Sequence, residues 1–337
     1  MPRGVLFSIS FDEQVNPYLE EARSGHIEWI RAMELVCSEE ALQDYLVWDV
    51  PQAAARTYPH ACVEDLVMLM NWFSLTFLLG EQFDDAPANR AERIACVARE
   101  LIVLPFEPDE TVPMGRCPIT AAWAQVWSWA SEGMSEPWRD RFCSSWARCL
   151  AAHAAQAQLW AGGEVLALDR YLALRRATVG IHQVDAAERA HGTELPPQVS
   201  SHPLMRRLRA AAADAAAWMN DIHMLECAEQ QGDGHNLVAV LRHERGYSRK
   251  AAIDEALWMT RQQLQVYRQL EAGVPRLYDE LWLTTDQRAV VEMGMGAIQA
   301  WVRSHHDWAL DVGRRGVGRA RGCGAAPEVR GPAAGGC

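Results

Sequence analysis

Segments rich in helix-forming residues, separated by proline and glycine, run through almost the entire chain. Alanine, leucine, arginine, glutamate and tryptophan are prominent, and strand-like alternation is hard to find outside residues 5–11. The sequence therefore predicts an all-α fold. The expected helices cover roughly residues 18–36, 40–48, 61–84, 89–103, 119–131, 136–161, 168–192, 203–229, 235–243, 248–271 and 278–311. Breakers lie between them at Pro51, Pro105, Gly162-Gly163, Pro196-Pro197 and Gly273-Val274-Pro275.

The end of the chain differs from the rest. Residues 313–337 contain glycine, arginine, alanine and proline without periodicity, and such a segment cannot bury enough apolar surface to become ordered. We expect one helical domain over residues 1–312 and a disordered tail over residues 313–337.

The composition excludes several classes of protein. A net charge of −12 argues against a nucleic-acid surface, because phosphate recognition needs a clustered basic face. No leader sequence opens the chain, and no window of about 18 uninterrupted apolar residues is present to span a bilayer. The nine cysteines form no CxxC pair, which favours reduced thiols. We expect a cytoplasmic protein without a membrane span.

The segment 61–84 is apolar nearly all round, which indicates an interior helix. It ends in Glu81, Asp84 and Asp85, whose spacing of i, i+3 and i+4 places three carboxylates on one helical face. Such a group can bind a hard cation through oxygen. The alternative is a solvated helix end.

A second polar motif follows in residues 169–180, which contain Tyr171, the pair Arg175-Arg176 and Gly180. A guanidinium donates to two phosphate oxygens at once and stays charged, so an arginine in this motif suits a phosphate ligand. Glycine inside a long helix destabilises it by roughly 1 kcal/mol unless a break in the helix is used there. An arginine pair alone more often forms a solvated face.

The third motif is a set of positions four residues apart on the helix expected around residue 220. Asn220 offers an amide oxygen to a metal, Met224 is a soft thioether and Ala228 offers no ligand. His223 is expected to be a wall or surface residue.

In their order and spacing, these motifs resemble those of bacterial class I terpene synthases, over residues 16–314. In that family an aspartate-rich motif closes the interior helix, and an Asn, Ser/Thr and Glu set holds one magnesium ion. In this register Gly80 replaces the first aspartate and Glu81 the second, Asp84 is the later acid, and Met224 and Ala228 replace two ligands.

The resemblance also assigns roles to other residues. Arg176 matches the diphosphate sensor, Val179 the linker and Gly180 the effector, whose carbonyl points at the forming carbocation. Asp221 matches a structural residue that bonds a neighbouring arginine. In the closing helix, Arg314 matches an arginine that contacts diphosphate, and Arg315 replaces a tyrosine.

The resemblance implies a single helical bundle around a deep cavity. The candidate wall residues are the aromatic side chains Trp72, Phe73, Phe77, Trp301 and Trp308, which would serve equally well as core packing. The implied metal ligands are Glu81, Asp84, Asp85 and Asn220, holding up to three Mg²⁺ ions with at least one weakened site.

The function implied is ionisation of a linear isoprenyl diphosphate, farnesyl diphosphate being the expected substrate, followed by cyclisation and release of diphosphate by a monomer or homodimer. Such an enzyme is a magnesium-dependent carbon–oxygen lyase. The alternative is a silent homologue that binds an isoprenoid or a partner protein, since four family positions are altered. A helical oxygenase is disfavoured because the sequence lacks the two Glu-x-x-His pairs that such a site needs.

Overall fold

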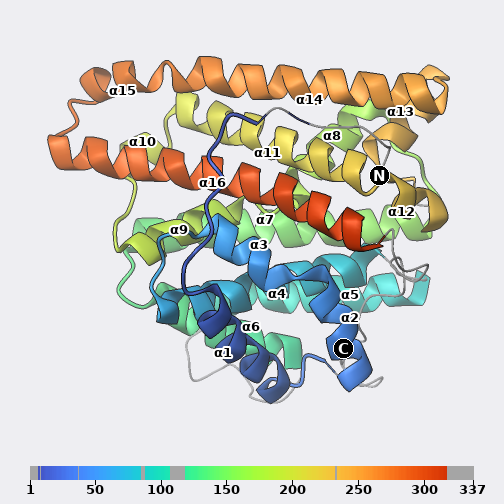
Figure 1. Ribbon diagram of the computed structural model, residues 1–337, viewed down its shortest axis with the longest axis horizontal. Coiled ribbons are helices and arrows are strands. Elements are labelled where there is room, and N and C mark those ends of the chain that lie inside the picture. The colour runs from blue at the N-terminus through green and yellow to red at the C-terminus, as the bar shows by residue number, and fades with distance from the viewer. Residues whose placement is uncertain are drawn as a thin grey trace. The chain divides into compact units, whose positions relative to one another are not determined.

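The computed structural model describes residues 7, 9–36, 38–84, 88–106, 118–231 and 234–316, without the side chains at 44, 79–84, 88–90, 93, 231 and 313–316. Every regular element in these ranges is a helix, which confirms the predicted all-α fold (Figure 1). The contact pattern divides the chain into two compact units. We call the described residues of 15–164 the N-terminal unit, and the described residues of 7–14 and 165–316 the C-terminal unit.

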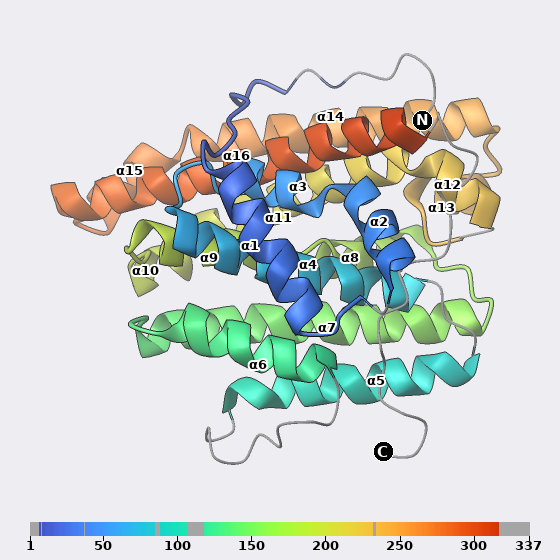
Figure 2. The same cartoon turned by 60° about the horizontal axis from the view of Figure 1, so that its bottom comes forward.

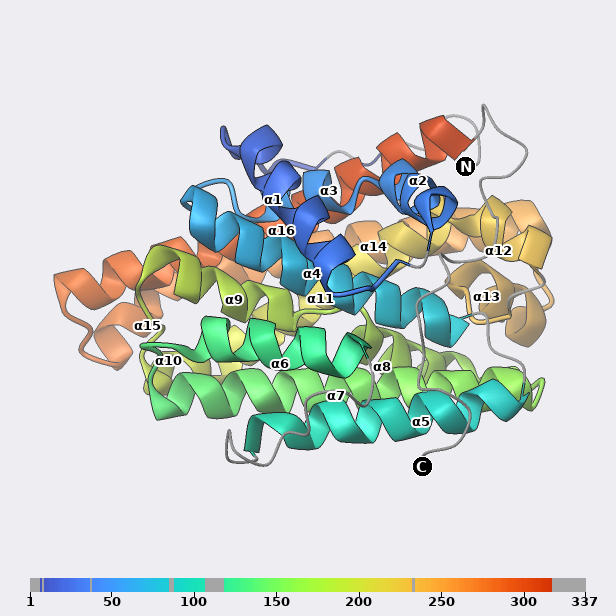
Figure 3. The same ribbon diagram turned by 90° about the horizontal axis from the view of Figure 1, so that it is seen from below.

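The N-terminal unit is organised around α4, the apolar helix predicted to be interior. Its elements are α1 (Leu19–Ala32), α2 (Glu39–Trp48), α3 (Val50–Thr57), α4 (Val63–Asp84), α5 (Ala88–Val103), η1 (Leu104–Phe106), α6 (Pro118–Ser131) and α7 (Glu136–Ala161). Helix α4 contacts α1, α3, α6 and α7, and α5 lies beside α6 and α7 (Figure 3). Gly25 permits the close approach of α1, because a Cβ there would lie 3.3 Å from Val67 Cγ2.

Large aromatic rings join α4 to α6 and α7. The ring centroid of Trp72 lies 4.4 Å from that of Trp123 and 4.3 Å from that of Phe142, with edge-to-face geometry. Trp146 stacks on Trp123 at 4.4 Å. Rings in such arrangements contribute beyond the area they bury, so this cluster fixes the three helices.

A buried neutral network joins α1, α2 and α4. The His26 Nδ1–H donates to Asn71 Oδ1 (2.7 Å), and Nε2 accepts from the Tyr45 hydroxyl (2.8 Å). The Tyr45 oxygen in turn pairs with Ser74 Oγ (2.6 Å). Burial lowers the pKa of His26 to about 4, so the imidazole is neutral at pH 7. The network therefore buries four polar side chains without burying a charge.

The C-terminal unit is organised around α11. Its helices are α8 (Leu168–Thr178), α9 (His182–His191), α10 (Pro197–Ser200), α11 (Pro203–His223), α12 (Leu225–Gln231), α13 (Leu237–Arg245), α14 (Arg249–Glu271), α15 (Val274–Glu280) and α16 (Thr285–Gly316). Helices α14 and α16 both contact α11 (Figures 1 and 2). Six of the residues 211–217 of α11 are buried alanines, and their small side chains allow neighbouring helices to come close.

The segment around Phe11 packs onto this unit. The Phe11 carbonyl accepts a hydrogen bond from Arg303 Nη1 of α16 (2.8 Å), and the Phe11 ring lies 5.4 Å from that of Tyr267 of α14. This explains why residues 9–14 group with the C-terminal unit.

Several predicted boundaries are wrong. The helix expected over 40–48 is α2, which ends before Pro51 as predicted, but Pro51 lies in the first turn of a further helix, α3, that was not predicted. Proline is tolerated there because its missing N–H has no helical partner. The helix expected over 203–229 is interrupted at Met224, and the segment 278–311 is replaced by α15 and α16 with a turn between them. The helix expected over 168–192 is divided into α8 and α9, with the predicted break at Gly180.

Other expectations concern the termini and the cysteines. The backbone of α16 continues through Gly316, and the rest of the predicted tail lies outside the described residues, so the division into a domain over 1–312 and a tail stays a prediction. Cys96 and Cys227 each take part in a disulfide, so the expectation of reduced cysteines is wrong for these two, whereas Cys62, Cys143 and Cys149 are free thiols. No helix in the described part of the chain is long and apolar enough to cross a bilayer.

Candidate functional site

The break between α8 and α9 depends on Gly180. Its φ of +84° lies in a region that side chains with a Cβ rarely adopt, which explains the glycine. The Gly180 carbonyl accepts a hydrogen bond from Gln183 N (3.0 Å). Gln183 Oε1 in turn accepts from Trp301 Nε1 (2.8 Å), which ties the start of α9 to α16. The predicted helix break at Gly180 is confirmed, while the effector role of its carbonyl stays a prediction.

Arg176, the predicted diphosphate ligand, is held by a carboxylate on α11. Its Nε and Nη2 atoms donate to the two oxygens of Asp214, each at 2.7 Å. The Asp214 side chain is 3% exposed and that of Arg176 is 46% exposed. One edge of the guanidinium therefore faces the protein, and the other is open to a ligand.

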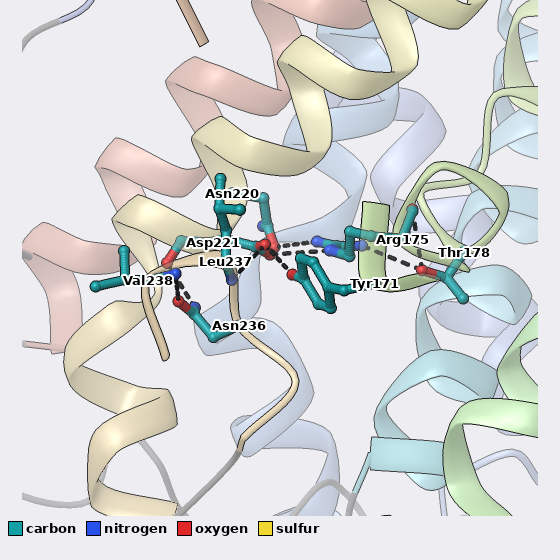
Figure 4. A network of polar contacts seen from close by, with 8 residues as sticks. All are labelled: Tyr171, Arg175, Thr178, Asn220, Asp221, Asn236, Leu237 and Val238. Atoms are coloured by element: carbon teal, nitrogen blue, oxygen red, sulfur yellow. Dashed lines mark hydrogen bonds and ion pairs between the residues drawn. The ribbon is translucent and has the colours of Figure 1, made fainter. Parts of the chain in front are cut away.

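The adjacent Arg175 lies in a more enclosed network (Figure 4). Its Nε donates to Asp221 Oδ1 and its Nη2 to Asn220 Oδ1, both at 2.9 Å. The side chains of Arg175 and Asp221 are 15% and 5% exposed. This ion pair confirms the expected bond between Asp221 and a neighbouring arginine.

Asp221 also fixes the start of α13. Its Oδ2 accepts from Leu237 N (3.1 Å) and from the Tyr171 hydroxyl, and its backbone carbonyl accepts from Asn236 Nδ2 (2.7 Å). Asn236 is the N-cap of α13, because its Oδ1 accepts from Val238 N (3.0 Å). One carboxylate thus connects α8, α11 and α13 (Figure 4).

Among the described residues, the side chains around Asn220 do not form a magnesium site. Mg²⁺ prefers a near-octahedral set of oxygen ligands. The Asn220 amide oxygen already accepts a hydrogen bond from Arg175, Met224 is the C-cap of α11, and Ala228 is buried without an oxygen in its side chain. Within the described residues, no group of three or more His, Cys, Asp or Glu side chains is placed to hold a metal ion.

The side chains of the predicted metal ligands at the end of α4 lie outside the described part of the structure. The side chains of Glu81 and Asp84, and the whole of Asp85, lie outside the described residues. The side chain of Arg314 does too, although its backbone belongs to α16. Their roles stay predictions.

The aromatic residues proposed for a cavity wall differ in burial. Trp72 and Trp301 are almost completely buried, Trp72 within the aromatic cluster and Trp301 against the His305 ring at 4.4 Å. Phe73 is 8% exposed. Phe77 is half-buried beside Trp48 at 5.4 Å, and Trp308 is half-buried on α16. A role in the wall stays a prediction for all five.

Sequence reasoning missed two partners of the site, Asp214 and Asn236. Asp214 is the one residue other than alanine between positions 210 and 217, which singles it out on a buried helix. Asn236 precedes an apolar helical segment, as N-cap residues do. Both signals were present in the sequence, but neither identifies the partner.

Comparison with known proteins identifies relatives over most of the chain. A model of the family described as terpene synthase family 2, C-terminal metal binding, matches residues 71–265. A 7-epi-alpha-eudesmol synthase ((2E,6E)-farnesyl diphosphate cyclizing) from Streptomyces viridochromogenes is 50% identical over 317 residues, which cover 93% of this chain and 92% of the relative. A pentalenene synthase from Streptomyces avermitilis is 31% identical over 324 residues, covering 93% and 94%. The crystal structure of an a-eudesmol synthase superposes with a TM-score of 0.85 at 50% identity, over 91% of this chain and 99% of that one.

Proposed function

Because the chain belongs to the terpene synthase family, we propose that it ionises farnesyl diphosphate and cyclises the carbocation with release of diphosphate. In this reaction the bond between C1 and the diphosphate oxygen breaks, and its electron pair leaves with the diphosphate. The carbocation then closes one or more rings and loses a proton or is captured by water. The sequence predicted this family, its all-α fold and this activity, and the comparisons agree.

The choice of substrate is supported by the relative at 50% identity, whose name specifies farnesyl diphosphate. That relative is named for eudesmol, so sesquiterpene alcohols belong among the products to be sought. The cytoplasmic location and the monomeric or homodimeric state stay predictions.

The observation that carries the proposal is the Arg176 guanidinium. It is a permanent cation, oriented by a bidentate contact with Asp214 and still 46% exposed. A leaving diphosphate needs such a charge-assisted donor. Arg175 is less suited to this task, because Asn220 and Asp221 already engage its donors.

The metal of this family is Mg²⁺, as the sequence predicted. The described residues of α11 and α12 do not provide its oxygen ligands, since only Asn220 remains of the expected set and its oxygen faces Arg175. The number of ions that this chain binds, and the part taken by the acids of α4, stay predictions.

The direct experiment incubates the purified protein with geranyl, farnesyl or geranylgeranyl diphosphate and magnesium. Products are identified by gas chromatography with mass spectrometry, and released pyrophosphate is measured. We expect farnesyl diphosphate to give a cyclic sesquiterpene. A folded protein that releases no pyrophosphate from any of the three would support the silent, isoprenoid-binding alternative.

The role of Arg176 has its own measurement. Arg176→Ala should weaken binding of inorganic pyrophosphate by about 1.5–3 kcal/mol, as expected for loss of a hydrogen bond to a charged group. Calorimetry in magnesium buffer provides the affinity. Arg207→Ala, which removes the same charge at an exposed position of α11, is the matched control and should leave the affinity unchanged. Equal affinity in the parent and Arg176→Ala would remove Arg176 from the site.

A further inference from the structure

Asp214 is a single acid within a run of alanines on α11. Residues 210–213 and 215–217 of α11 are all alanine, and Asp214 is 2% exposed among them. An alanine at this position would continue the run without burying a polar group. Helix packing therefore does not explain why an acid occupies position 214.

Burial makes this carboxylate unfavourable by itself. Desolvation raises the pKa of Asp214 above its usual value, although the Arg176 hydrogen bond and charge act in the opposite direction. Removal from water thus outweighs the gain from the ion pair. A carboxylate whose burial disfavours ionisation contributes little to stability. Its role is better sought in how it orients its partner.

The geometry of the contact between Asp214 and Arg176 indicates that the carboxylate orients the guanidinium. Both Asp214 oxygens are used, one by Nε and the other by Nη2 of Arg176, each at 2.7 Å. A bidentate contact fixes the plane of a guanidinium as well as its position. Of the five N–H donors of a guanidinium, two are used here, and no other partner of Arg176 occurs among the described residues.

Arg175 shows the opposite arrangement on the same turn of α8. Its side chain is only 15% exposed, and its donors are divided between two residues of α11, Asn220 and Asp221. The two arginines thus have different tasks. Arg175 joins helices, and Arg176 presents an oriented, open edge.

We propose that Asp214 is the positioning residue of this site, which holds the Arg176 guanidinium in the orientation that receives the diphosphate. The inference rests on the diphosphate-binding role proposed above for Arg176. Asp214 itself does not touch the substrate, and it acts only through Arg176. Its contribution to binding should therefore disappear when Arg176 is absent.

A double-mutant cycle tests this dependence. The four proteins are the parent, Asp214→Ala, Arg176→Ala and the double variant, and the probe is inorganic pyrophosphate titrated calorimetrically in magnesium buffer. Asp214→Ala extends the alanine run and should fold, yet it should weaken pyrophosphate binding by about tenfold because the guanidinium is no longer fixed. In the Arg176→Ala background the same change should have no further effect. Asp214→Asn keeps one acceptor and should lie between the parent and Asp214→Ala.

The matched control is another arginine–carboxylate pair, Arg23 and Asp49 of the N-terminal unit, whose atoms Nη1 and Oδ1 are 2.5 Å apart. Asp49→Asn weakens that ion pair and should leave pyrophosphate affinity unchanged. Melting curves for every variant separate lost folding from lost binding.

Two failures have different meanings. If Arg176→Ala weakens binding and Asp214→Ala does not, or if the two losses simply add, the positioning role is overturned while the proposed function stands. If Arg176→Ala has no effect, the diphosphate-binding role of Arg176 fails first, and the inference drawn from it falls too.

Discussion

Two buried polar networks in this chain are built from similar parts but differ in charge. The network in the N-terminal unit contains His26, Asn71, Tyr45 and Ser74 and carries no charge at pH 7. The network in the C-terminal unit also contains a tyrosine and an asparagine, but its centre is the ion pair of Arg175 and Asp221. Neutral groups are less costly to bury than charged ones, so a neutral network suffices where helices need only to be joined.

The charged network lies beside the proposed diphosphate ligand. Asp221 connects three helices and caps α13, and its arginine adjoins the residue proposed to bind diphosphate. A carboxylate accepts more hydrogen bonds than a neutral side chain of its size, which allows one residue to serve all these partners. Of these two networks, the charged one adjoins the proposed diphosphate site, and the neutral one joins packed helices.

The largest expected effect comes from removing one acceptor from each network. Asp221→Leu should lower the free energy of unfolding by about 3–5 kcal/mol, because it leaves the Arg175 guanidinium buried without its carboxylate. Asn71→Leu, the matched change in the neutral network, should cost about 1–3 kcal/mol. Urea unfolding gives both values, provided that the slope with urea is unchanged. Equal losses would show that charge does not distinguish the networks.

The second prediction concerns acid. The pKa of His26 is about 4 in the folded state and about 6.5 unfolded, so protonation favours the unfolded chain. This group should therefore reduce stability by about 3 kcal/mol as the pH falls from about 6.5 to 4. The pKa of Asp221 is instead raised by burial, so its carboxyl binds a proton more readily when folded and acid does not destabilise the protein through this group.

The measurement is unfolding free energy against pH for the parent, His26→Gln and Asp221→Leu. His26→Gln should flatten the curve between pH 6.5 and 4, and Asp221→Leu should not. Burial also lowers the pKa of His223 and His305, to about 3 and about 4, so the readout is the difference between each variant and the parent. A curve for His26→Gln that is parallel to the parent's would contradict the prediction.

The smallest effect separates the two tyrosines. Tyr171 donates to the charged Asp221, whereas Tyr45 pairs with the neutral His26 and Ser74. Hydrogen bonds to charged groups contribute about 1.5–3 kcal/mol and neutral ones about 0.5–1.5 kcal/mol. Tyr171→Phe should therefore cost about 1 kcal/mol more than Tyr45→Phe in thermal or urea unfolding. The reverse order would mean that the fold does not use the charge of Asp221 in this way.

The sequence predicted breaks where the backbone itself demands them. Gly180 adopts a positive φ, and a glycine inside a helical segment is a visible signal of such a break. Met224 gives no such signal, since methionine is a good helix former, and its hydrogen bonds to Asn220 O and from Ala228 N nearly continue the helix. Helix α3 was not predicted, because a proline after one helix can also lie in the first turn of the next.

The partners of side chains were harder to predict than the helices. The motif containing Arg175 and Arg176 was found, but adjacent residues of α8 reach carboxylates seven positions apart on α11, and only the packed helices show which arginine is enclosed. The roles of Asp214 and Asn236 likewise depend on neighbours distant in the sequence. Helical periodicity can be read from neighbouring residues in the sequence. The orientation of a guanidinium depends on residues that are distant in the sequence.

The alanine run of α11 has a consequence for how this chain can change over time. A buried position whose neighbours leave room for only a methyl group accepts glycine or serine but resists larger residues, so random substitutions in residues 211–217 should be lost by selection far more often than those on exposed faces. Asp214 is the departure from that rule within the run. In a lineage that abandons diphosphate chemistry, it should be the first position of the run to drift toward alanine.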